Sequence, residues 1–257
     1  KIKEELLHYF ANNPDPDYIT FSGGGEPTLN KIMGKCLRFI KKTKANIPIA
    51  VLTNGTLFYQ KEVRDELMQA DLVLPSLDAV TAVNFKKINR PEKNLNIDQC
   101  IEGLIQFSCE FKGKIWLEIF ILPDYNADKA ELAKMKEIIL QIAPEKVQLN
   151  SLDRPGTVHN LRGASKAELE EIKAFWNLDN VEIIVAAAKR KNQQSYREDK
   201  ETAILETISR RPCTVDDLCS ILGLHINEVN KYLDVLEAAK KIHRQKQERG
   251  IFYQVEE

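Results

Sequence analysis

The stretch YITFSGGGEPTLN, residues 18–30, ends a strand-like run with three consecutive glycines and then places a glutamate directly before a proline. Each glycine costs about 0.5–1 kcal/mol relative to alanine in regular structure, so a run of three indicates a position where the backbone itself is needed. Glu26 precedes Pro27 and is predicted to be extended, which suits a carboxylate that accepts hydrogen bonds from an ammonium group. We therefore expect a ligand site directly after this strand.

The first 186 residues alternate between strand-like and helical segments. The strand-like runs cover residues 18–23, 48–55, 71–79, 115–123, 146–152 and 181–186. Helical patterns cover residues 30–44, 59–70, 95–112, 127–142 and 165–176, with Asn30, Asn126 and Ser165 as expected caps. The strand-like runs are nearly continuous apolar segments, which is typical of parallel strands covered by helices. This order predicts an α/β fold, either an open parallel sheet or a partial parallel (β/α) barrel.

The composition changes after this alternating region. We predict an α/β domain over residues 1–188 and a polar linker, KRKNQQSYREDK, over residues 189–200. Residues 201–257 read as three amphipathic helices followed by two short strands that turn near Gly250. Three helices and a two-stranded wing predict a small winged-helix domain.

Bulk composition excludes several function classes. The 257 residues contain 37 Lys and Arg against 38 Asp and Glu, so no bulk charge favours a nucleic acid, a membrane or an acidic partner. The five cysteines form no Cys-x-x-Cys pair, which favours a reducing, cytoplasmic compartment. No apolar run approaches the roughly 20 residues that a membrane span requires, so we expect no membrane partner. The four histidines are scattered and predict no His-based metal site.

Small and polar residues gather at the carboxyl ends of the predicted strands, where a serial β/α fold exposes backbone groups. The expected cofactor-binding residues are Gly23, Gly24, Gly25, Glu26, Thr53, Asn54, Ser76, Asp78 and Asn150. Ser76 and Asp78 are two positions apart, so their side chains point the same way and suit the vicinal hydroxyls of a ribose. A carboxylate for an ammonium and a polar pair for a ribose together describe S-adenosylmethionine. We expect the substrate to enter near Asn150, Asp153 and Arg154.

Each of these features has a plainer interpretation. The glycine run could be a structural turn or a phosphate loop, although it fits neither G-x-x-x-x-G-K-[ST] nor G-x-G-x-x-G. Asp78 could cap a helix, and Asn54 could simply occupy an Asn-Gly turn. The segment 89–91 could end a helix rather than steer a substrate. Glu118 and Phe120 share one face of a strand, where a glutamate among apolar neighbours needs a partner or a shifted pKa.

Several of these motifs, in this order, resemble the radical S-adenosylmethionine superfamily. The stretches SGGGEPTL, LTNG and LPSLDA are similar to its cofactor-binding motifs. INRP, FKGKIWLEIFIL and VQLN resemble an Fe–S oxidoreductase branch that is distantly similar to the tRNA wyosine-forming radical enzymes. The resemblance covers roughly residues 1–186 and implies a partial barrel of radical SAM type. It implies that Glu26 holds the methionine amino group, while Ser76 and Asp78 hold the ribose.

The resemblance also implies an activity and its cofactors. These are reductive cleavage of S-adenosylmethionine to a 5′-deoxyadenosyl radical, a four-iron four-sulfur cluster, and a reductant such as flavodoxin or ferredoxin. The radical would act on an unknown substrate, for example RNA or another macromolecule. The Cys-x-x-x-Cys-x-x-Cys cluster signature does not occur in these 257 residues. We therefore expect the cluster loop and the first strand of the barrel to lie upstream of Lys1, and no metal ligands in this chain.

The predicted winged helix offers a second function. Residues 200–257 carry nine basic and ten acidic side chains, whereas a typical DNA reader presents a basic face. A local basic cluster is nevertheless present at the end of the third helix and in the wing: Lys240, Lys241, Arg244, Lys246 and Arg249. Nucleic-acid contact by this cluster and an ordinary solvated surface are both open at this point. The alternative to an enzyme is a ligand-sensing regulatory protein that binds DNA through its winged helix.

Overall fold

The computed structural model describes residues 2–152, 161–184, 200–247 and 249–256. The chain divides into two compact units, which we describe separately. The large unit comprises Lys1–Ser151 and Ala164–Ile183, and the small unit comprises Leu152–Gly163 and Ile184–Glu257. Most of the predicted linker lies outside the described residues, and its last residue, Lys200, begins the first helix of the small unit.

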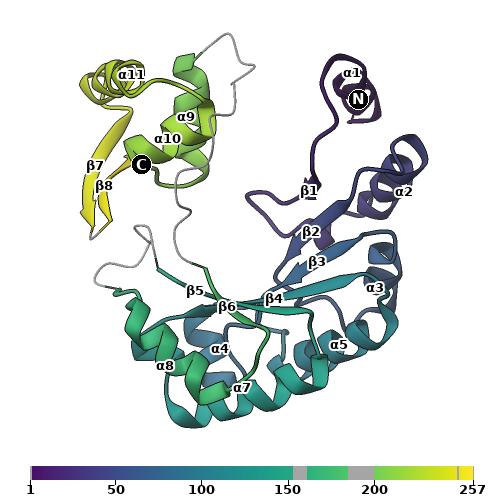
Figure 1. Cartoon of the computed structure of the whole chain (residues 1–257). Helices are drawn as coiled ribbons and strands as arrows, with labels where there is room; N and C mark the ends of the chain where they lie inside the picture. The colour runs from purple at the N-terminus through teal and green to yellow at the C-terminus, as the bar shows by residue number, and fades with distance from the viewer. Residues whose placement is uncertain (1, 153–160, 185–199, 248, 257) are drawn as a thin grey trace. The chain divides into compact units, whose positions relative to one another are not determined.

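The large unit is built on one parallel sheet (Figure 1). Its strands are β1 (Ile19–Phe21), β2 (Ile49–Thr53), β3 (Leu72–Pro75), β4 (Lys114–Ile121), β5 (Lys146–Ser151) and β6 (Val181–Ile183). They lie in sequence order, and each pairs in parallel with the next. A doubly wound sheet reverses its strand order at a switch point, whereas a barrel winds in one direction. The sequential order therefore decides between the two predicted architectures in favour of a partial barrel.

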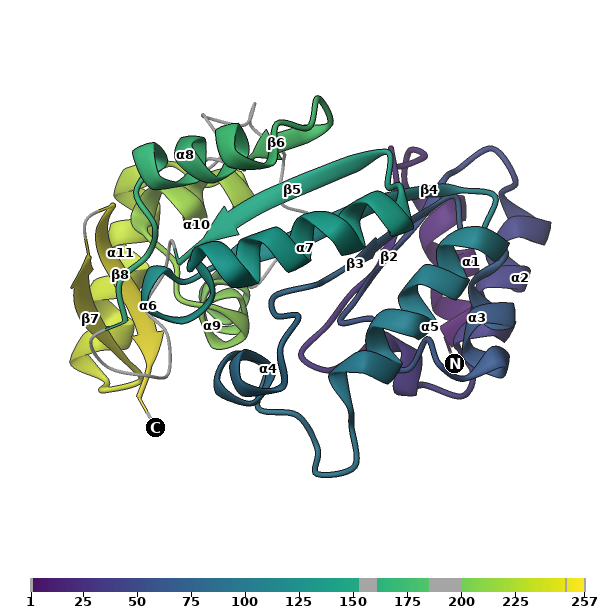
Figure 2. The ribbon, with the colours of Figure 1, turned by 90° about the horizontal axis from the view of Figure 1, so that it is seen from below.

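Helices cover one face of this sheet. The helical segments of the large unit are α1 (Ile2–Asn12), η1 (Pro27–Leu29), α2 (Met33–Thr43), α3 (Lys61–Leu67), α4 (Ala82–Ile88), α5 (Ile97–Glu110), α6 (Pro123–Asn126), α7 (Lys129–Ile142) and α8 (Lys166–Trp176). Figure 1 shows α4, α5, α7 and α8 on one side of the strands, and Figure 2 shows α5 and α7 from that side. Right-handed crossovers between parallel strands that always advance in one direction place the helices on the same side.

The core of the large unit lies between the strands and these helices. Along β4 the burial alternates: Ile115, Leu117 and Ile119 are buried, while Glu118 and Phe120 on the other face are only partly buried. On the helical side, Phe107 of α5 and Trp176 of α8 are fully buried. Because neighbouring side chains on a strand point to opposite faces, the partly exposed face of the sheet is the one that can present polar groups.

Two of the three predicted caps are wrong. Ser165 caps α8 through a capping box with Glu168, as predicted. The N-cap of α2 is Ile32, and Asn30 instead accepts a hydrogen bond from the Ile32 N–H in the turn before the helix. The N-cap of α7 is Asp128, whereas Asn126 is fully buried and holds the end of β4. A sequence pattern shows that a polar residue precedes a helix but does not show which of several such residues turns inward.

The small unit has the predicted winged-helix fold. Its elements are α9 (Lys200–Arg210), α10 (Val215–Leu222), α11 (Ile226–Ala238), β7 (Ile242–Gln247) and β8 (Gly250–Val255). The two strands are antiparallel, and Gln247 pairs with Gly250 at the turn. Ile204, Leu218 and Leu233 form its core between the three helices. Among the described residues of the whole chain, no helix has the length and apolar character needed to cross a membrane.

Candidate functional site

Glu26 joins the loop after β1 to the end of β2. Its Oε1 accepts hydrogen bonds from the Thr28 N–H at 3.0 Å, the Thr28 hydroxyl at 2.7 Å and the Thr53 hydroxyl at 2.6 Å. Its Oε2 accepts one hydrogen bond, from the Asn54 N–H at 2.7 Å. A carboxylate has about four lone-pair sites, so Oε2 keeps room for a further donor. The extended conformation predicted before Pro27 is present, with φ −71° and ψ 117°.

The three glycines before Glu26 are not required by the packing of the chain. A Cβ placed on Gly23, Gly24 or Gly25 meets no other heavy atom within 4 Å in the described part of the chain. None of the three has the left-handed backbone that excludes most side chains. Neither crowding nor a left-handed backbone therefore accounts for the choice of glycine at these positions in the described structure.

Asn54 occupies a turn and also lines a pocket, so both interpretations from the sequence hold for its geometry. Its Oδ1 accepts hydrogen bonds from the Thr56 N–H at 3.0 Å and the Thr56 hydroxyl at 2.7 Å. Gly55 follows in the left-handed conformation, with φ +68°. This local turn consumes the amide oxygen of Asn54 and leaves its NH₂ group as the polar end available to a ligand.

Asp78 lies at the end of the β3 strand segment and is held by two neutral donors. Its Oδ1 accepts from the Phe120 N–H and its Oδ2 from the Asn89 side-chain amide, both at 3.0 Å. The pKa of Asp78 is raised to about 6, chiefly by desolvation and to a smaller extent by the nearby Glu118 carboxylate, although the hydrogen bonds from Phe120 and Asn89 act in the opposite direction. The N-cap of α4 is Thr81, so the alternative in which Asp78 caps this helix is wrong.

A pocket connects several of the predicted residues. It is partly open to solvent, and its cavity volume is about 20 Å³. Its polar wall is formed by Asn54, Ser76, Asp78 and Asn89, and its apolar wall by Phe85 and Leu104. The glycine run and Glu26 do not line it, but Glu26 is linked to it through the Asn54 N–H. The strand-end residues therefore form two adjoining parts, a carboxylate at β1–β2 and a pocket at β2–β3.

Asn150 belongs to a third part of the same face. Its side-chain amide donates to the Glu118 carboxylate on the neighbouring strand β4. The backbone of Glu118 also forms an isolated parallel bridge with the backbone of Ser76. In this bridge the Leu77 N–H donates to the Glu118 carbonyl oxygen. Glu118 thus has the partner that its position required, and it extends the row of polar groups that the strand-end motifs predicted. Asp153 and Arg154, expected near the substrate, lie outside the described residues.

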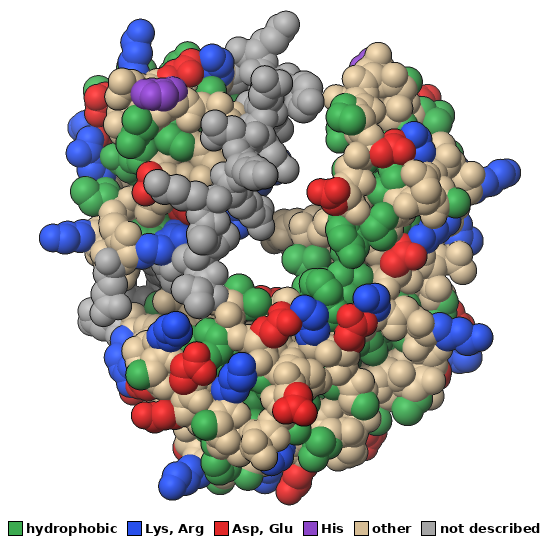
Figure 3. Space-filling view, in the orientation of Figure 1, with side chains coloured by type: hydrophobic (Ala, Val, Ile, Leu, Met, Phe, Trp, Pro, Cys, Tyr) green, Lys and Arg blue, Asp and Glu red, His purple; other side chains and the backbone are tan. Residues whose placement is uncertain are grey.

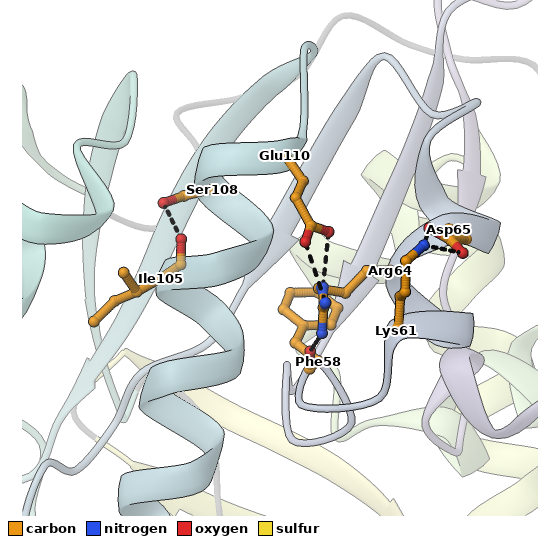
Figure 4. A network of polar contacts seen from close by, with 7 residues as sticks. All are labelled: Phe58, Lys61, Arg64, Asp65, Ile105, Ser108 and Glu110. Carbon is orange, nitrogen blue, oxygen red and sulfur yellow. Dashed lines mark hydrogen bonds and ion pairs between the residues drawn. The ribbon is translucent and has the colours of Figure 1, made fainter.

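Arg64 of α3 and Glu110 of α5 form an ion pair that sequence reasoning missed. Arg64 is 2 % exposed, and it donates to both oxygens of Glu110 at 2.8 and 3.2 Å and to the Phe58 carbonyl oxygen at 2.8 Å. Figure 4 shows this network between α3 and α5. At Gly103 of α5, an added Cβ would lie 2.3 Å from the Tyr59 nitrogen. The loop that follows Asn54 is therefore held from beneath by α3 and α5.

Two buried polar residues fix the segment that carries Asp78. Glu131 of α7 is 2 % exposed and accepts from the Val80 and Thr81 N–H groups at 2.7 and 3.1 Å. Asn126 donates to the Asp78 carbonyl oxygen at 2.8 Å and to the Phe120 carbonyl oxygen at 2.7 Å. Both residues act on backbone and tie the ends of β3 and β4 to the helices behind them.

The basic cluster of the small unit is largely neutralised by ion pairs. Arg244 contacts Glu237 at 2.5 Å and Asp234 at 3.5 Å, and Arg249 contacts Asp217 at 2.7 Å. Lys241 contacts Glu201 at 3.5 Å. The other two members, Lys240 and Lys246, are exposed. On the large unit, the face in Figure 3 shows acidic and basic side chains interspersed.

The metal-binding capacity of the described residues is limited. No group of three or more His, Cys, Asp or Glu side chains in the described ranges is arranged to hold a metal ion. The five cysteines, Cys36, Cys100, Cys109, Cys213 and Cys219, are not joined by disulfides. Cys100 borders the pocket, and burial raises the pKa of its thiol. The described residues therefore do not supply the ligands of a four-iron cluster.

Comparison with known sequences agrees with the two-part organisation. Residues 187–247 match the family model of the DprA winged helix domain. A protein named GTPase Obg from Brachyspira hyodysenteriae is 35 % identical over 95 % of this chain and 35 % of its own length. A UPF0026 protein of Methanocaldococcus jannaschii is 29 % identical over 87 % of this chain and 70 % of its own. The chain thus spans about a third of the first of these relatives.

Comparison with solved structures shows the fold of the large unit. A radical SAM methyltransferase from Sphaerobacter thermophilus matches 72 % of this chain and 55 % of its own, with a TM-score of 0.54 and 16 % identity. A domain of pyruvate-formate lyase-activating enzyme from Bacteroides vulgatus matches 65 % of this chain and 98 % of its own, with a TM-score of 0.50 and 19 % identity. The large unit thus shares the fold of these two proteins, as a partial parallel (β/α) barrel, and the small unit is a winged helix.

Proposed function

We propose that the chain is the cofactor-binding part of a radical S-adenosylmethionine enzyme. The observation that carries the proposal is the charge of the site. Glu26, Asp78 and Glu118 all lie at or near the strand ends, and each is hydrogen-bonded only by neutral donors among the described residues. Neutral donors hold a carboxylate in place without cancelling its charge. The site therefore favours a ligand with net positive charge, such as a sulfonium that also carries an ammonium group.

The proposed roles follow from the geometry of each part. Glu26 accepts from the ligand ammonium through Oε2, which has one donor in the described structure. The backbone of the glycine run approaches the ligand without interference from a Cβ. Asn54 offers its NH₂ group to the sugar or the carboxylate of the ligand. Ser76 and Asp78 hold the ribose hydroxyls within the pocket, and Asn150 acts through Glu118.

The proposal includes a cluster that the described residues do not ligate. When bound, such a four-iron cluster would supply the electron for reductive cleavage of the ligand, and its ligands would come from residues other than those described here. The residues of this chain bind and orient the ligand and, through the apolar wall at Phe85 and Leu104, exclude water from it.

The proposed substrate class is a macromolecule such as RNA. The sequence resemblance to the tRNA wyosine-forming enzymes supports this, and so does the presence of a winged helix on the same chain. A reductant protein such as flavodoxin or ferredoxin is the proposed electron donor. The ion pairs around Arg244 and Arg249 do not favour the alternative in which DNA binding is the main activity.

The test uses the protein expressed from its complete reading frame, purified without oxygen and reconstituted with iron and sulfide. It is mixed with S-adenosylmethionine and dithionite, and 5′-deoxyadenosine and methionine are quantified. We expect both products in equal amounts, and a loss of both in Glu26→Gln. A reconstituted protein that contains the cluster, binds S-adenosylmethionine and forms neither product would overturn the proposal.

A further inference from the structure

Two buried threonines converge on Glu26 from different elements. Thr28 lies in η1 and is 6 % exposed, and Thr53 ends β2 and is 5 % exposed. Both hydroxyls donate to the same carboxylate oxygen, Oε1, at 2.7 and 2.6 Å. A buried hydroxyl needs a partner, but nothing in that requirement directs both threonines to one oxygen of one side chain.

The direction of the Thr53 proton is fixed by a third group. The Thr53 Oγ1 accepts a hydrogen bond from the Gly55 N–H at 3.1 Å, which leaves its own proton for Glu26. Oε1 therefore receives three donors, since the Thr28 N–H also reaches it at 3.0 Å. Oε2 receives only the Asn54 N–H. The two oxygens of Glu26 are in different environments, one saturated by the chain and one with remaining acceptor capacity.

We infer that Thr28 and Thr53 are positioning residues that orient Glu26, so that Oε2 is the oxygen offered to the amino-acid end of an adenosyl ligand. This inference rests on the proposed function. Without the two hydroxyls, the carboxylate loses two of its four hydrogen bonds and can rotate, and the acceptor for the ammonium is no longer fixed. The threonines touch Glu26 rather than the ligand, so their effect is confined to affinity for ligands that carry the ammonium.

The inference is tested with two ligands that differ only at that end. S-adenosylhomocysteine carries the amino acid, and 5′-methylthioadenosine has a methyl group in its place. Their dissociation constants are measured by calorimetry for the complete protein and for Thr53→Val, which keeps the shape of threonine but lacks the hydroxyl. We expect Thr53→Val to bind S-adenosylhomocysteine about tenfold more weakly, which corresponds to about 1.4 kcal/mol. Binding of 5′-methylthioadenosine is expected to be unchanged.

Thr53→Ser is the matched control, because it restores the hydroxyl and removes only a methyl group. We expect it to recover most of the affinity for S-adenosylhomocysteine, a rescue that a packing role of the threonine methyl group does not predict. Thr28→Val is the second variant, to be used if Thr53→Val does not fold. Folding is checked by fluorescence, since both tryptophans of the chain, Trp116 and Trp176, lie in the large unit.

Three outcomes separate the inference from the proposed function. If the native protein binds S-adenosylhomocysteine and Thr53→Val binds it equally well, the positioning role is wrong and the proposed function stands. If the variant loses affinity for both ligands to the same degree, the threonine supports the loop rather than the carboxylate, and the inference is again overturned. If the native protein binds neither ligand, the proposed function fails and the inference fails with it.

Discussion

The strand-end site of the large unit and the wing of the small unit both contain several charged side chains, but these side chains have neutral partners in the site and charged partners in the wing. In the site, Glu26, Asp78 and Glu118 are bonded to hydroxyl, amide and backbone N–H donors. In the wing, Arg244 and Arg249 are each bonded to carboxylates at 2.5 and 2.7 Å. The site keeps its negative charge, and the wing cancels most of its positive charge.

The difference bears on which region is built for a charged ligand. An ion pair has little field beyond the two groups that form it, whereas a carboxylate held by dipoles still attracts a cation. A cluster of basic residues in the sequence is therefore weak evidence for nucleic-acid binding. A cluster of carboxylates without basic partners is stronger evidence for a cationic ligand. Substitutions in either region test this difference.

The largest effect is expected from Glu26→Gln. A hydrogen bond to a charged group contributes about 1.5–3 kcal/mol, so we expect S-adenosylmethionine to bind on the order of 10- to 100-fold more weakly. Calorimetry on the complete protein measures this. Glu237→Gln in α11, at the ion-pair partner of Arg244, is the matched control and should leave the affinity unchanged. Equal affinity in native protein and Glu26→Gln would remove the assigned role of this carboxylate.

The next largest effect tests whether the site rests on a rigid frame. In Gly103→Ala the new Cβ lies 2.3 Å from the Tyr59 nitrogen, a backbone atom that cannot turn aside. We expect a loss of about 1–3 kcal/mol in the free energy of unfolding, measured with urea and tryptophan fluorescence. Gly24→Ala, with open space around the new Cβ, is expected to change stability by less than about 0.5 kcal/mol. It should nevertheless weaken binding of S-adenosylmethionine.

Similar losses of stability in Gly103→Ala and Gly24→Ala would contradict the contact assigned to α5. If Gly24→Ala changed neither stability nor affinity, the glycine run would have no part in ligand binding.

A smaller, pH-dependent effect is expected at Asp78. Its pKa is raised from 3.8 to about 6, so between these values the folded protein holds more protons than the unfolded chain. The contribution of Asp78 to stability is therefore present below about pH 4 and is lost as the pH rises through about 6. Asp78→Asn lacks this dependence. Relative to the native protein, its stability should rise by on the order of 1–3 kcal/mol between pH 4 and pH 7.

Urea unfolding at several pH values, followed by the fluorescence of Trp116 and Trp176, checks this sign. A stability difference between Asp78→Asn and the native protein that is the same at pH 4 and pH 7 would show that Asp78 is not desolvated.

The smallest effects are expected in the wing. Exposed ion pairs contribute about 0.2–1 kcal/mol, so Arg244→Gln should alter the stability of the small unit only slightly. In a plot of the logarithm of the affinity for duplex DNA against the logarithm of the salt concentration, we expect a slope of about −2 or shallower, since each neutralised phosphate adds about −0.9. A slope of about −5 or steeper would show that the ion pairs open and that the basic cluster binds nucleic acid.

Much of the fold could be predicted from the sequence because the signals are local. All six strands of the sheet begin and end within a few residues of the predicted runs, since continuous apolar segments identify buried parallel strands. The three helices and the wing of the small unit were found for the same reason. The residue pattern alone could not decide between an open sheet and a partial barrel, because that choice depends on strand order, and only the family resemblance implied the barrel.

The site was predicted only in part, since its contacts join distant segments. The motifs identified Glu26 and Asp78, but not the Thr28 and Thr53 hydroxyls on Glu26. The Arg64–Glu110 pair spans 46 positions and has no sequence pattern. In the wing, the five basic residues were visible as a cluster, but the carboxylates that pair with them come from elsewhere in the small unit. The sequence shows which residues are charged, but it does not show which of them form ion pairs.

The most direct measurement of the central claim compares S-adenosylmethionine with S-adenosylhomocysteine on the complete protein, by calorimetry at low and moderate salt. The two ligands differ by one methyl group and one positive charge at sulfur. Because the carboxylates of the site keep their charge, the account predicts that the sulfonium ligand binds about fivefold or more tightly, with a smaller ratio at higher salt. Equal or weaker binding of S-adenosylmethionine would contradict it.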